Sequence, residues 1–123
     1  MQLENVKTKF LGENSIFYNH IDSTQNEIWR LIESKNTPNG TLVFADIQDK
    51  GIGTHGRVWH TDEANNIAFS FFIRTNCNVQ KLEGITIEIA KIIVDILKKE
   101  YEINLNIKEP NDITFNNKKI GGI

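Results

Sequence analysis

Apolar and polar residues alternate in blocks along the chain, and three of these blocks have the length and composition of β-strands. Ser15 to Ile21 is rich in β-branched and aromatic residues, which indicates a short strand. Thr41 to Gln48 is a largely apolar run of strand length. Ile67 to Arg74 carries Phe and Ile at both odd and even positions, as expected for a strand covered on each side. We therefore expect Ile67 to Arg74 in the centre of a sheet.

Two other segments have the three-and-four spacing of apolar residues that predicts a helix. The first starts near Asp22, Ser23 and Thr24, which are good helix-starting residues, and runs to about Ser34. Thr24 and Glu27 have the spacing of a capping box. The expected apolar face of this helix consists of Ile28, Trp29, Leu31 and Ile32. The second helix is expected from Leu82 through Tyr101, with an apolar face made of Leu82, Ile85, Ile89, Ile92, Ile93, Ile96 and Leu97.

The last part of the chain reads as short strands joined by turns. Leu105 to Lys108, Ile113 to Phe115 and Lys118 to Ile123 are the strand candidates. Asn116-Asn117 is a tight-turn pair between the second and the third. The apolar ending, with no polar tail after it, leads us to expect that the chain stops in the middle of a sheet, which leaves strand edges that need cover.

Composition narrows the class of protein. A length of 123 residues, with 39% hydrophobic and 24% charged residues, is typical of a globular domain with one compact core. The net charge of −2 shows no basic surplus, so we expect no nucleic-acid binding. Cys77 is the single cysteine, which excludes an intramolecular disulfide, and we interpret it as an ordinary loop thiol. No segment approaches the roughly 20 apolar residues of a membrane span, and we expect a cytoplasmic protein.

Gly51 to Gly56 matches Gly-x-Gly-x-x-Gly, a weak signal for dinucleotide binding. The Rossmann version must open a helix and be followed about 20 residues later by an acidic residue, but Phe71 stands there. What remains is a strand-anchored glycine loop followed by a cation, Arg57, and a flat aromatic, Trp59. Backbone N–H groups of such a loop can approach phosphate, and an aromatic face can stack on a base. The alternative is a mobile surface loop with a core tryptophan.

Histidine does not point to a metal centre. His20, His55 and His60 have no metal-ligand spacing with other ligands nearby, so we interpret them as ordinary polar residues and expect no zinc site.

Four segments together resemble the signature motifs of the biotin protein ligase family. The glycine loop is similar to the family's Gly-Arg-Gly-Arg-x-Gly-Arg-x-Trp, and Gln48 matches the glutamine that usually precedes it. Asp22 to Gln25 resembles the Asp-Ser-Thr-Asn stretch where the family's first helix begins. Lys108 to Ile113 resembles Lys-Trp-Pro-Asn-Asp-Ile, and Lys118 to Ile123 resembles the Lys-Lys/Arg-x-Gly-Gly-Ile that follows it. The motifs occur in the family's order.

The resemblance implies an α+β fold with a mixed sheet flanked by helices, the class II aminoacyl-tRNA-synthetase-like fold of biotin and lipoate ligases, incomplete at the C-terminus. Residues 1–123 would form a partial catalytic domain, with neither an N-terminal winged helix nor a C-terminal barrel domain. The implied reaction activates biotin with ATP, accompanied by Mg²⁺, to biotinyl-5′-AMP. The biotinyl group then passes to a lysine of a biotin carboxyl carrier protein. A homo-oligomer or a complementing C-terminal polypeptide would cover the exposed sheet edges.

The resemblance also assigns roles to residues. The implied catalytic residues are Lys119, Arg57 and Asp112. The implied biotin-binding residues are Ser23, Thr24, Gln25, Gln48, Gly51, Ile52, Gly53, Thr54 and Lys119. The implied ATP- or adenylate-binding residues are Gly53, Thr54, Gly56, Arg57, Trp59, Asn111 and Lys119. Asn111 and Asp112 would orient Lys108 or a phosphate-bound Mg²⁺.

Three positions depart from the family pattern. Ile52 and Thr54 replace two loop arginines, and Glu109 replaces a tryptophan with a charge that must stay in water or find a partner such as Lys108. Loss of the second arginine is expected to weaken retention of the adenylate. Two alternatives therefore stay open: a non-catalytic relative that binds biotin or a nucleotide, and a lipoate or octanoate ligase of the same fold.

Overall fold

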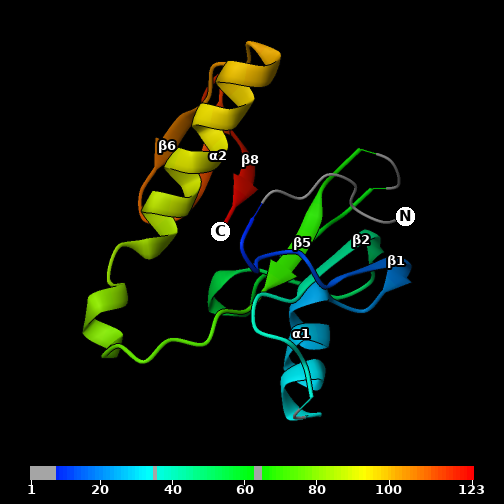
Figure 1. The fold of residues 1–123 in the computed structure, drawn as a ribbon. Helices are drawn as coiled ribbons and strands as arrows, with labels where there is room; N and C mark the ends of the chain where they lie inside the picture. Colours follow the sequence, from blue (N-terminus) through cyan, green and yellow to red (C-terminus); the bar gives the residue numbers. More distant parts are fainter. Residues whose placement is uncertain (1–7, 35, 63–64) are drawn as a thin grey trace. The chain divides into compact units, whose positions relative to one another are not determined.

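The computed structural model describes residues 8–34, 36–62 and 65–123, which form two compact units, one up to Thr75 and the other from Asn76 (Figure 1). Each unit has its own buried apolar side chains. In the first these are Ile28, Val43, Ala45 and Ala68, and in the second Ala90 and Ile113. Where the length predicts one core, the chain thus has two small ones. No described helix is long and apolar enough to cross a bilayer.

The first unit is built on a mixed three-stranded sheet in the order β1-β2-β5. β1 (Ser15–Ile21) pairs parallel with β2 (Leu42–Gln48), and β2 pairs antiparallel with β5 (Ala68–Phe71). The sequence predicts all three strands, and the mixed sheet with helices confirms the α+β class. β5 nevertheless lies at an edge, with β2 in the centre, so the central position expected for it is wrong.

The aromatic residues of β5 explain this difference. Phe17, Phe44 and Phe69 are register partners across the three strands, and the rings of Phe17 and Phe44 lie 5.1 Å apart. Aromatic residues opposite each other on one sheet face are stabilised by cross-strand ring contacts. On the other face of β5, Ala68 is buried, and α1 contacts this strand. Each face of β5 thus has its own reason to be apolar, and apolar residues on both sides do not indicate a central strand.

α1 (Thr24–Glu33) lies against β2 and β5 (Figure 1). Ile28 of the helix is buried, as expected. Trp29 is 56% exposed, so its assignment to the apolar face is wrong. The capping box at Thr24 is also wrong: Ser23 is the N-cap, and its hydroxyl accepts a hydrogen bond from the Asn26 amide at 3.3 Å. Thr24 is instead the first helical residue.

Two short strands, β3 (Gly51–Ile52) and β4 (Val58–Trp59), form a hairpin directly after β2. A 3₁₀ turn, η1 (Thr54–Gly56), makes the tip of the hairpin. The glycines lead directly into this 3₁₀ turn and β4, whereas the Rossmann motif opens an α-helix, so the rejection of the Rossmann interpretation is confirmed.

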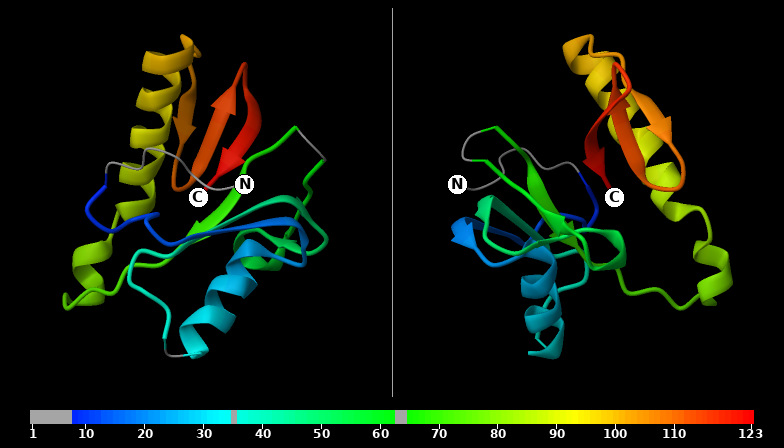
Figure 2. Two further views of the ribbon diagram at one scale, coloured as in Figure 1. Left: turned by 45° about the vertical axis from the view of Figure 1, so that its right-hand side comes forward. Right: turned by 180° about the vertical axis from the view of Figure 1, so that it is seen from behind.

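The second unit consists of α2 (Ile85–Tyr101) packed on an antiparallel sheet (Figure 2). Its strands are β6 (Asn106–Lys108), β7 (Asp112–Phe115) and β8 (Lys118–Gly122), in the order β6-β7-β8. Asn116 and Asn117 both have positive φ in the turn between β7 and β8, as the Asn-Asn pair predicts.

The expected bounds and face of α2 need two corrections. A 3₁₀ turn, η2 (Val79–Leu82), ends at Leu82, and the helix begins only after Gly84, whose φ of 79° belongs to the left-handed region. The buried side of α2 centres on Ala90, whereas Ile92 is 58% exposed and Ile85 and Ile96 are also exposed. The helix is apolar around so much of its circumference that spacing alone cannot identify the packed face.

Candidate functional site

Thr24, the first residue of α1, forms a hydrogen-bonded cluster with Gln48 at the end of β2 and Ser70 in β5. The Thr24 amide donates to Gln48 Oε1 at 2.8 Å, and the Thr24 hydroxyl reaches the same oxygen at 3.1 Å. The Thr24 hydroxyl also lies 2.9 Å from Ser70 Oγ. Thr24 is only 3% exposed, so these bonds are shielded from water. The helix start, the end of β2 and β5 therefore meet at one polar point in the first unit.

The neighbouring candidates Ser23 and Gln25 have different surroundings. Ser23 is fully buried, and its hydroxyl is engaged in capping the helix. Gln25 is exposed to solvent. The Asp-Ser-Thr-Gln segment thus places three successive side chains in three environments, of which Thr24 is the one bonded to Gln48.

The glycine hairpin begins three residues after Gln48 and is held tightly at its root. Gly51 and Trp59 are register partners in the β3–β4 pair. A Cβ on Gly51 would overlap the carbonyl oxygen of Trp59 and would lie 3.1 Å from Gln48 Nε2. Only glycine therefore allows β3 and β4 to approach this closely beside Gln48.

The tip of the hairpin carries the remaining loop candidates. The Gly53 amide donates to the Arg57 carbonyl at 2.8 Å, and the Arg57 amide donates to the Thr54 carbonyl at 3.3 Å. His55 and Gly56 have φ of 58° and 73°, which closes the turn. The side chains of Ile52, Thr54 and Arg57 are exposed, whereas Trp59 is half-buried. Arg57 is thus the single arginine or lysine of the hairpin from Gly51 to Trp59.

Backbone bonds join the hairpin root to the turn between β1 and α1. The Asp49 amide donates to the Ile21 carbonyl at 3.0 Å, and the Lys50 amide donates to the Asp22 carbonyl at 2.8 Å. Thr61 binds the backbone of Gln48. Its hydroxyl accepts a hydrogen bond from the backbone N–H of Gln48 at 2.8 Å and donates one to the backbone carbonyl of Gln48 at 3.2 Å. Gln48 is therefore fixed at both its backbone and its side chain.

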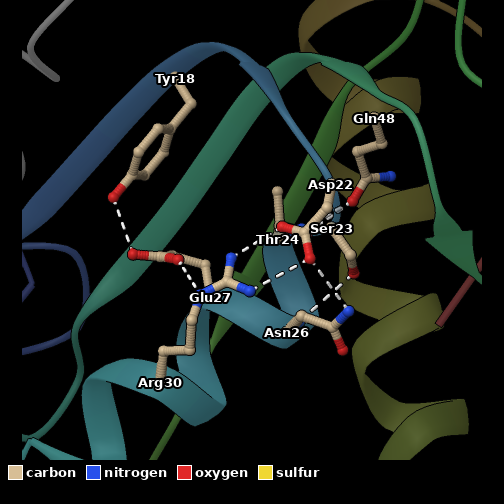
Figure 3. Close-up of polar contacts among 8 residues, drawn as sticks. All are labelled: Tyr18, Asp22, Ser23, Thr24, Asn26, Glu27, Arg30 and Gln48. Carbon is tan, nitrogen blue, oxygen red and sulfur yellow. Dashed lines mark hydrogen bonds and ion pairs between the residues drawn. The ribbon is translucent and has the colours of Figure 1, made fainter.

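A network of hydrogen bonds and ion pairs joins Arg30 to Asp22, which lies in the turn between β1 and α1, and to Glu27 and Tyr18 (Figure 3). Arg30 makes two hydrogen bonds to the Asp22 carboxylate, at 2.7 and 3.1 Å, and a third to Glu27 at 2.6 Å. The Tyr18 hydroxyl donates to the other oxygen of Glu27 at 2.8 Å. Arg30, hydrogen-bonded to Asp22, holds the pKa of that carboxyl well below its usual range. Burial and the Glu27 contact raise the pKa of Tyr18.

The lowered pKa of Asp22 predicts an acid-dependent stability difference. Because its folded pKa lies below the unfolded value of about 3.9, ionised Asp22 stabilises the fold above about pH 4, and this is lost as pH falls through the folded pKa. We expect Asp22→Asn to lower the free energy of unfolding by about 0.5–1 kcal/mol at pH 7, since the pair is partly exposed. Urea unfolding at pH 7, 4 and 2 should show the difference shrinking below pH 4. Asp95→Asn on α2 is the control, and a gap of equal size at pH 2 would contradict the assignment.

The second unit holds the candidates from the two C-terminal motifs. Lys119 Nζ lies 2.7 Å from Asp112 Oδ1, and both side chains are partly exposed. Lys119 is the register partner of Thr114, and a register shift follows between Ile113 and Thr114. Asp112 and Thr114 are two residues apart and therefore lie on the same face of β7. Lys119, opposite Thr114, reaches Asp112 diagonally across the strand pair. The carboxylate that the resemblance assigns to Lys108 or Mg²⁺ thus contacts Lys119.

The other residues of these motifs lie close by. Asn111 binds the C-terminal segment through both backbone and side chain, since its carbonyl accepts from the Ile123 amide at 3.0 Å and its Nδ2 donates to the Ile123 carbonyl at 3.2 Å. Glu109 is exposed, so its charge stays in water as expected. Among the residues that the structure describes, no three His, Cys, Asp or Glu side chains are grouped to hold a metal ion.

Two contacts of Gln48 and Thr24 come from residues outside the predicted set. Ser70 is a lone hydroxyl within the apolar run Ile67 to Arg74, and that exception was an available signal. Thr61 lies in a polar turn, where nothing in the sequence distinguishes it from its neighbours. The hydrogen bonds of Arg30 to Asp22 and Glu27 also correspond to no motif in the sequence.

Comparison with known proteins agrees with these motifs. The model of the biotin/lipoate A/B protein ligase family matches residues 17–123. The bifunctional ligase/repressor BirA of Bacillus subtilis is 37% identical over 118 residues, which are 96% of this chain and 36% of that protein. The Escherichia coli protein of the same name is 29% identical over 104 residues, 84% of this chain and 32% of its own length. The chain spans about a third of the length of these curated relatives.

Solved structures share the fold. The biotin protein ligase from Aquifex aeolicus in complex with biotin and ATP superposes with a TM-score of 0.72 at 31% identity, covering 89% of this chain and 45% of that one. The biotin protein ligase from Leishmania major in complex with biotinyl-5-AMP has a TM-score of 0.69 at 22% identity, over 89% of this chain and 50% of that one, which speaks for the fold alone. The family match over most of the chain, the similarity to BirA and this shared fold agree, and the chain belongs to the biotin/lipoate A/B protein ligase family as a relative of the biotin protein ligases.

Proposed function

We propose that this chain takes part in the ATP-dependent biotinylation of a protein, with biotin and ATP as its substrates. The carboxylate of biotin attacks the α-phosphate of ATP, pyrophosphate leaves, and biotinyl-5′-AMP is formed. The amine of an acceptor lysine, on a biotin carboxyl carrier protein, then attacks the acyl carbon and AMP leaves. The related Aquifex aeolicus ligase has been solved in complex with biotin and ATP, which supports the choice of these two substrates.

The cluster of Thr24, Gln48 and Ser70 is the observation that carries the proposal. A cyclic urea such as that of biotin offers one acceptor and two donors, and it needs matching polar groups in a sheltered place. Gln48 Oε1 accepts twice from Thr24, which directs the amide nitrogen of Gln48 toward the side of Gly51 as a donor. The two hydroxyls can each donate or accept. The cluster therefore supplies both kinds of partner that the urea requires.

The resemblance assigns the charged chemistry to Arg57 in the first unit and to Lys119 in the second. Two anions, a carboxylate and a phosphate, must approach each other, and cations aimed at the developing charge are the usual largest contribution to such a transfer. Arg57 projects from the glycine hairpin, and Lys119 is held by Asp112. Backbone N–H groups of the hairpin would add fixed dipoles near the phosphate.

Magnesium finds little support in the chain's own residues. The Asp112 carboxylate contacts Lys119, and no acidic cluster of three lies within the described part of the chain. A Mg²⁺ ion bound mainly by the phosphates of ATP is compatible with this, because Mg²⁺ commonly keeps few protein ligands. No step of the proposal depends on a protein-bound ion.

Calorimetry with biotin, ATP and lipoate, followed by a pyrophosphate-release assay, tests the proposal. We expect biotin to bind and pyrophosphate to be released only when biotin and ATP are both present. Biotin binding without pyrophosphate release would favour a binding protein, an outcome to which the exposed Ile52 and Thr54 in place of two arginines would contribute. Lipoate binding in preference to biotin would favour the other branch of the family.

Thr24→Val sharpens this test. The variant removes the hydroxyl that contacts Gln48 and Ser70 and that the proposed pocket offers to the urea. One hydrogen bond to the ligand contributes about 1 kcal/mol. We therefore expect the Kd for biotin to rise about five- to tenfold, since 1.4 kcal/mol corresponds to a factor of ten. Thr75→Val, at an exposed position, is the matched control. Equal affinities for the two variants would remove Thr24 from the proposed pocket.

A further inference from the structure

Arg30 lies outside the four motifs, yet its guanidinium touches the first of them (Figure 3). Nη2 and Nη1 donate to the two oxygens of Asp22 at 2.7 and 3.1 Å, and Nε donates to Glu27 at 2.6 Å. The hydroxyl of Tyr18, on β1, donates a hydrogen bond to Glu27 at 2.8 Å. A planar guanidinium that engages both oxygens of a carboxylate fixes the direction of that carboxylate, which a lysine ammonium cannot do.

Asp22 is the residue through which this orientation reaches the candidate site. It directly precedes Ser23 and Thr24, and its carbonyl accepts the Lys50 amide at 2.8 Å, one residue before Gly51. Its carboxylate also accepts from Asn26 Nδ2 at 3.3 Å. Asp22 thus joins the start of α1 to the root of the glycine hairpin, and Arg30 holds its side chain from further along the helix.

The exposure of the pair indicates what kind of contribution it makes. The side chains of Arg30 and Asp22 are 50% and 34% exposed, and partly exposed ion pairs add little to global stability. Their bidentate geometry can still restrict the local position of the backbone on which they stand. The main effect of Arg30 is therefore expected on the placement of Thr24 and Lys50, with a contribution to global stability of no more than about 1 kcal/mol.

We propose that Arg30 is a positioning residue for the ligand pocket: through Asp22 it holds the Thr24 amide against Gln48 and the glycine hairpin against the helix start. The ligand in this statement is biotin, so the inference rests in that respect on the proposed function. The three hydrogen bonds of the Arg30 guanidinium go to Asp22 and Glu27, so its influence on Gln48 and the hairpin passes by way of Asp22.

Amide hydrogen exchange followed by NMR tests the positioning without any ligand. We expect Arg30→Gln to speed exchange of the Thr24 and Lys50 amides by about tenfold, as for a local opening, while amides of β7 keep their rates. Arg30→Lys keeps the charge but loses the bidentate contact with Asp22, so exchange of the Thr24 and Lys50 amides should be as fast in this variant as in Arg30→Gln. Lys91→Gln removes a pair with Glu88 of similar length, 2.7 Å, on α2, and should change neither amide. Unchanged exchange at Thr24 and Lys50, or equal acceleration throughout the first unit, would overturn the inference.

Calorimetry with biotin then separates this inference from the proposed function. We expect Arg30→Gln to weaken biotin binding about tenfold while it lowers the free energy of unfolding by only about 1 kcal/mol, and Lys91→Gln to bind as the unsubstituted chain does. Faster exchange with unchanged biotin affinity would overturn the claim that Arg30 serves the pocket. If the unsubstituted chain binds no biotin, the proposed function fails, and the exchange rates alone decide whether Arg30 sets the local geometry.

Discussion

Lys119→Gln is expected to slow the formation of biotinyl-adenylate by about 100- to 1,000-fold, the usual loss when a group aimed at developing charge is removed. Lys119 has the Asp112 carboxylate at 2.7 Å, which orients the ammonium before any substrate arrives. Because both side chains are partly exposed, the pair adds no more than about 1 kcal/mol to stability, and the variant should stay folded. Pyrophosphate release measures the rate, and thermal unfolding monitors the fold.

Lys118→Gln is the matched control for this prediction. Lys118 is adjacent on β8 and pairs with Phe115, so its side chain points to the opposite face of the strand from Lys119. Both lysines are exposed, and both substitutions remove one positive charge. A comparable loss of rate in the two variants would show that general charge matters and that Lys119 has no special role.

Gly51→Ala is expected to destabilise the first unit by about 1–3 kcal/mol, the range for forcing an extra methyl group into a packed site. The added Cβ overlaps the Trp59 carbonyl and approaches Gln48 Nε2 to 3.1 Å, so β3 and β4 must separate and the Gln48 amide must move. Since Gln48 is bonded to Thr24, biotin affinity should fall in parallel. Urea unfolding and calorimetry with biotin measure the two effects.

Gly53→Ala, in the same hairpin, separates the clash from the loss of a glycine. A Cβ there would lie 3.2 Å from the Arg57 carbonyl, which the exposed tip can relieve by a small movement. We expect a clearly smaller loss of both stability and biotin affinity. If Gly53→Ala lowers stability and biotin affinity as much as Gly51→Ala does, the losses come from stiffening of the hairpin in general and not from contact of the added methyl group with Gln48.

The strands and helices were largely predictable because apolar periodicity and turn residues are local signals. β1 agrees with its predicted range, and the Asn116-Asn117 turn adopts the positive φ values that such a pair favours. Errors arose where two local interpretations fit equally well. Ser23, Thr24 and Asp22 can each cap a helix, and the choice of Ser23 follows from how Thr24 is bonded to Gln48 and Ser70.

The candidate site was predictable in its motifs and much less so in its contacts. The glycine loop was visible from its own spacing and Gln48 from the resemblance, and the structure bonds Gln48 to Thr24, 24 residues earlier in the chain. Ser70 joins them from 46 residues away, which no local pattern reports. Asp112 was expected beside Lys108 or Mg²⁺, and its contact with Lys119 depends on the pairing of β7 with β8.

Element types, the family resemblance and the residue types available for phosphate and urea chemistry all follow from the amino-acid order, since they depend on short-range patterns along the chain. Three features required the folded arrangement: the buried face of α2, the edge position of β5, and the grip of Arg30 on Asp22 behind the hairpin root. Burial and hydrogen bonding depend on distances in space. Residues far apart in the chain acquire those distances only when the strands have paired and the helices have packed.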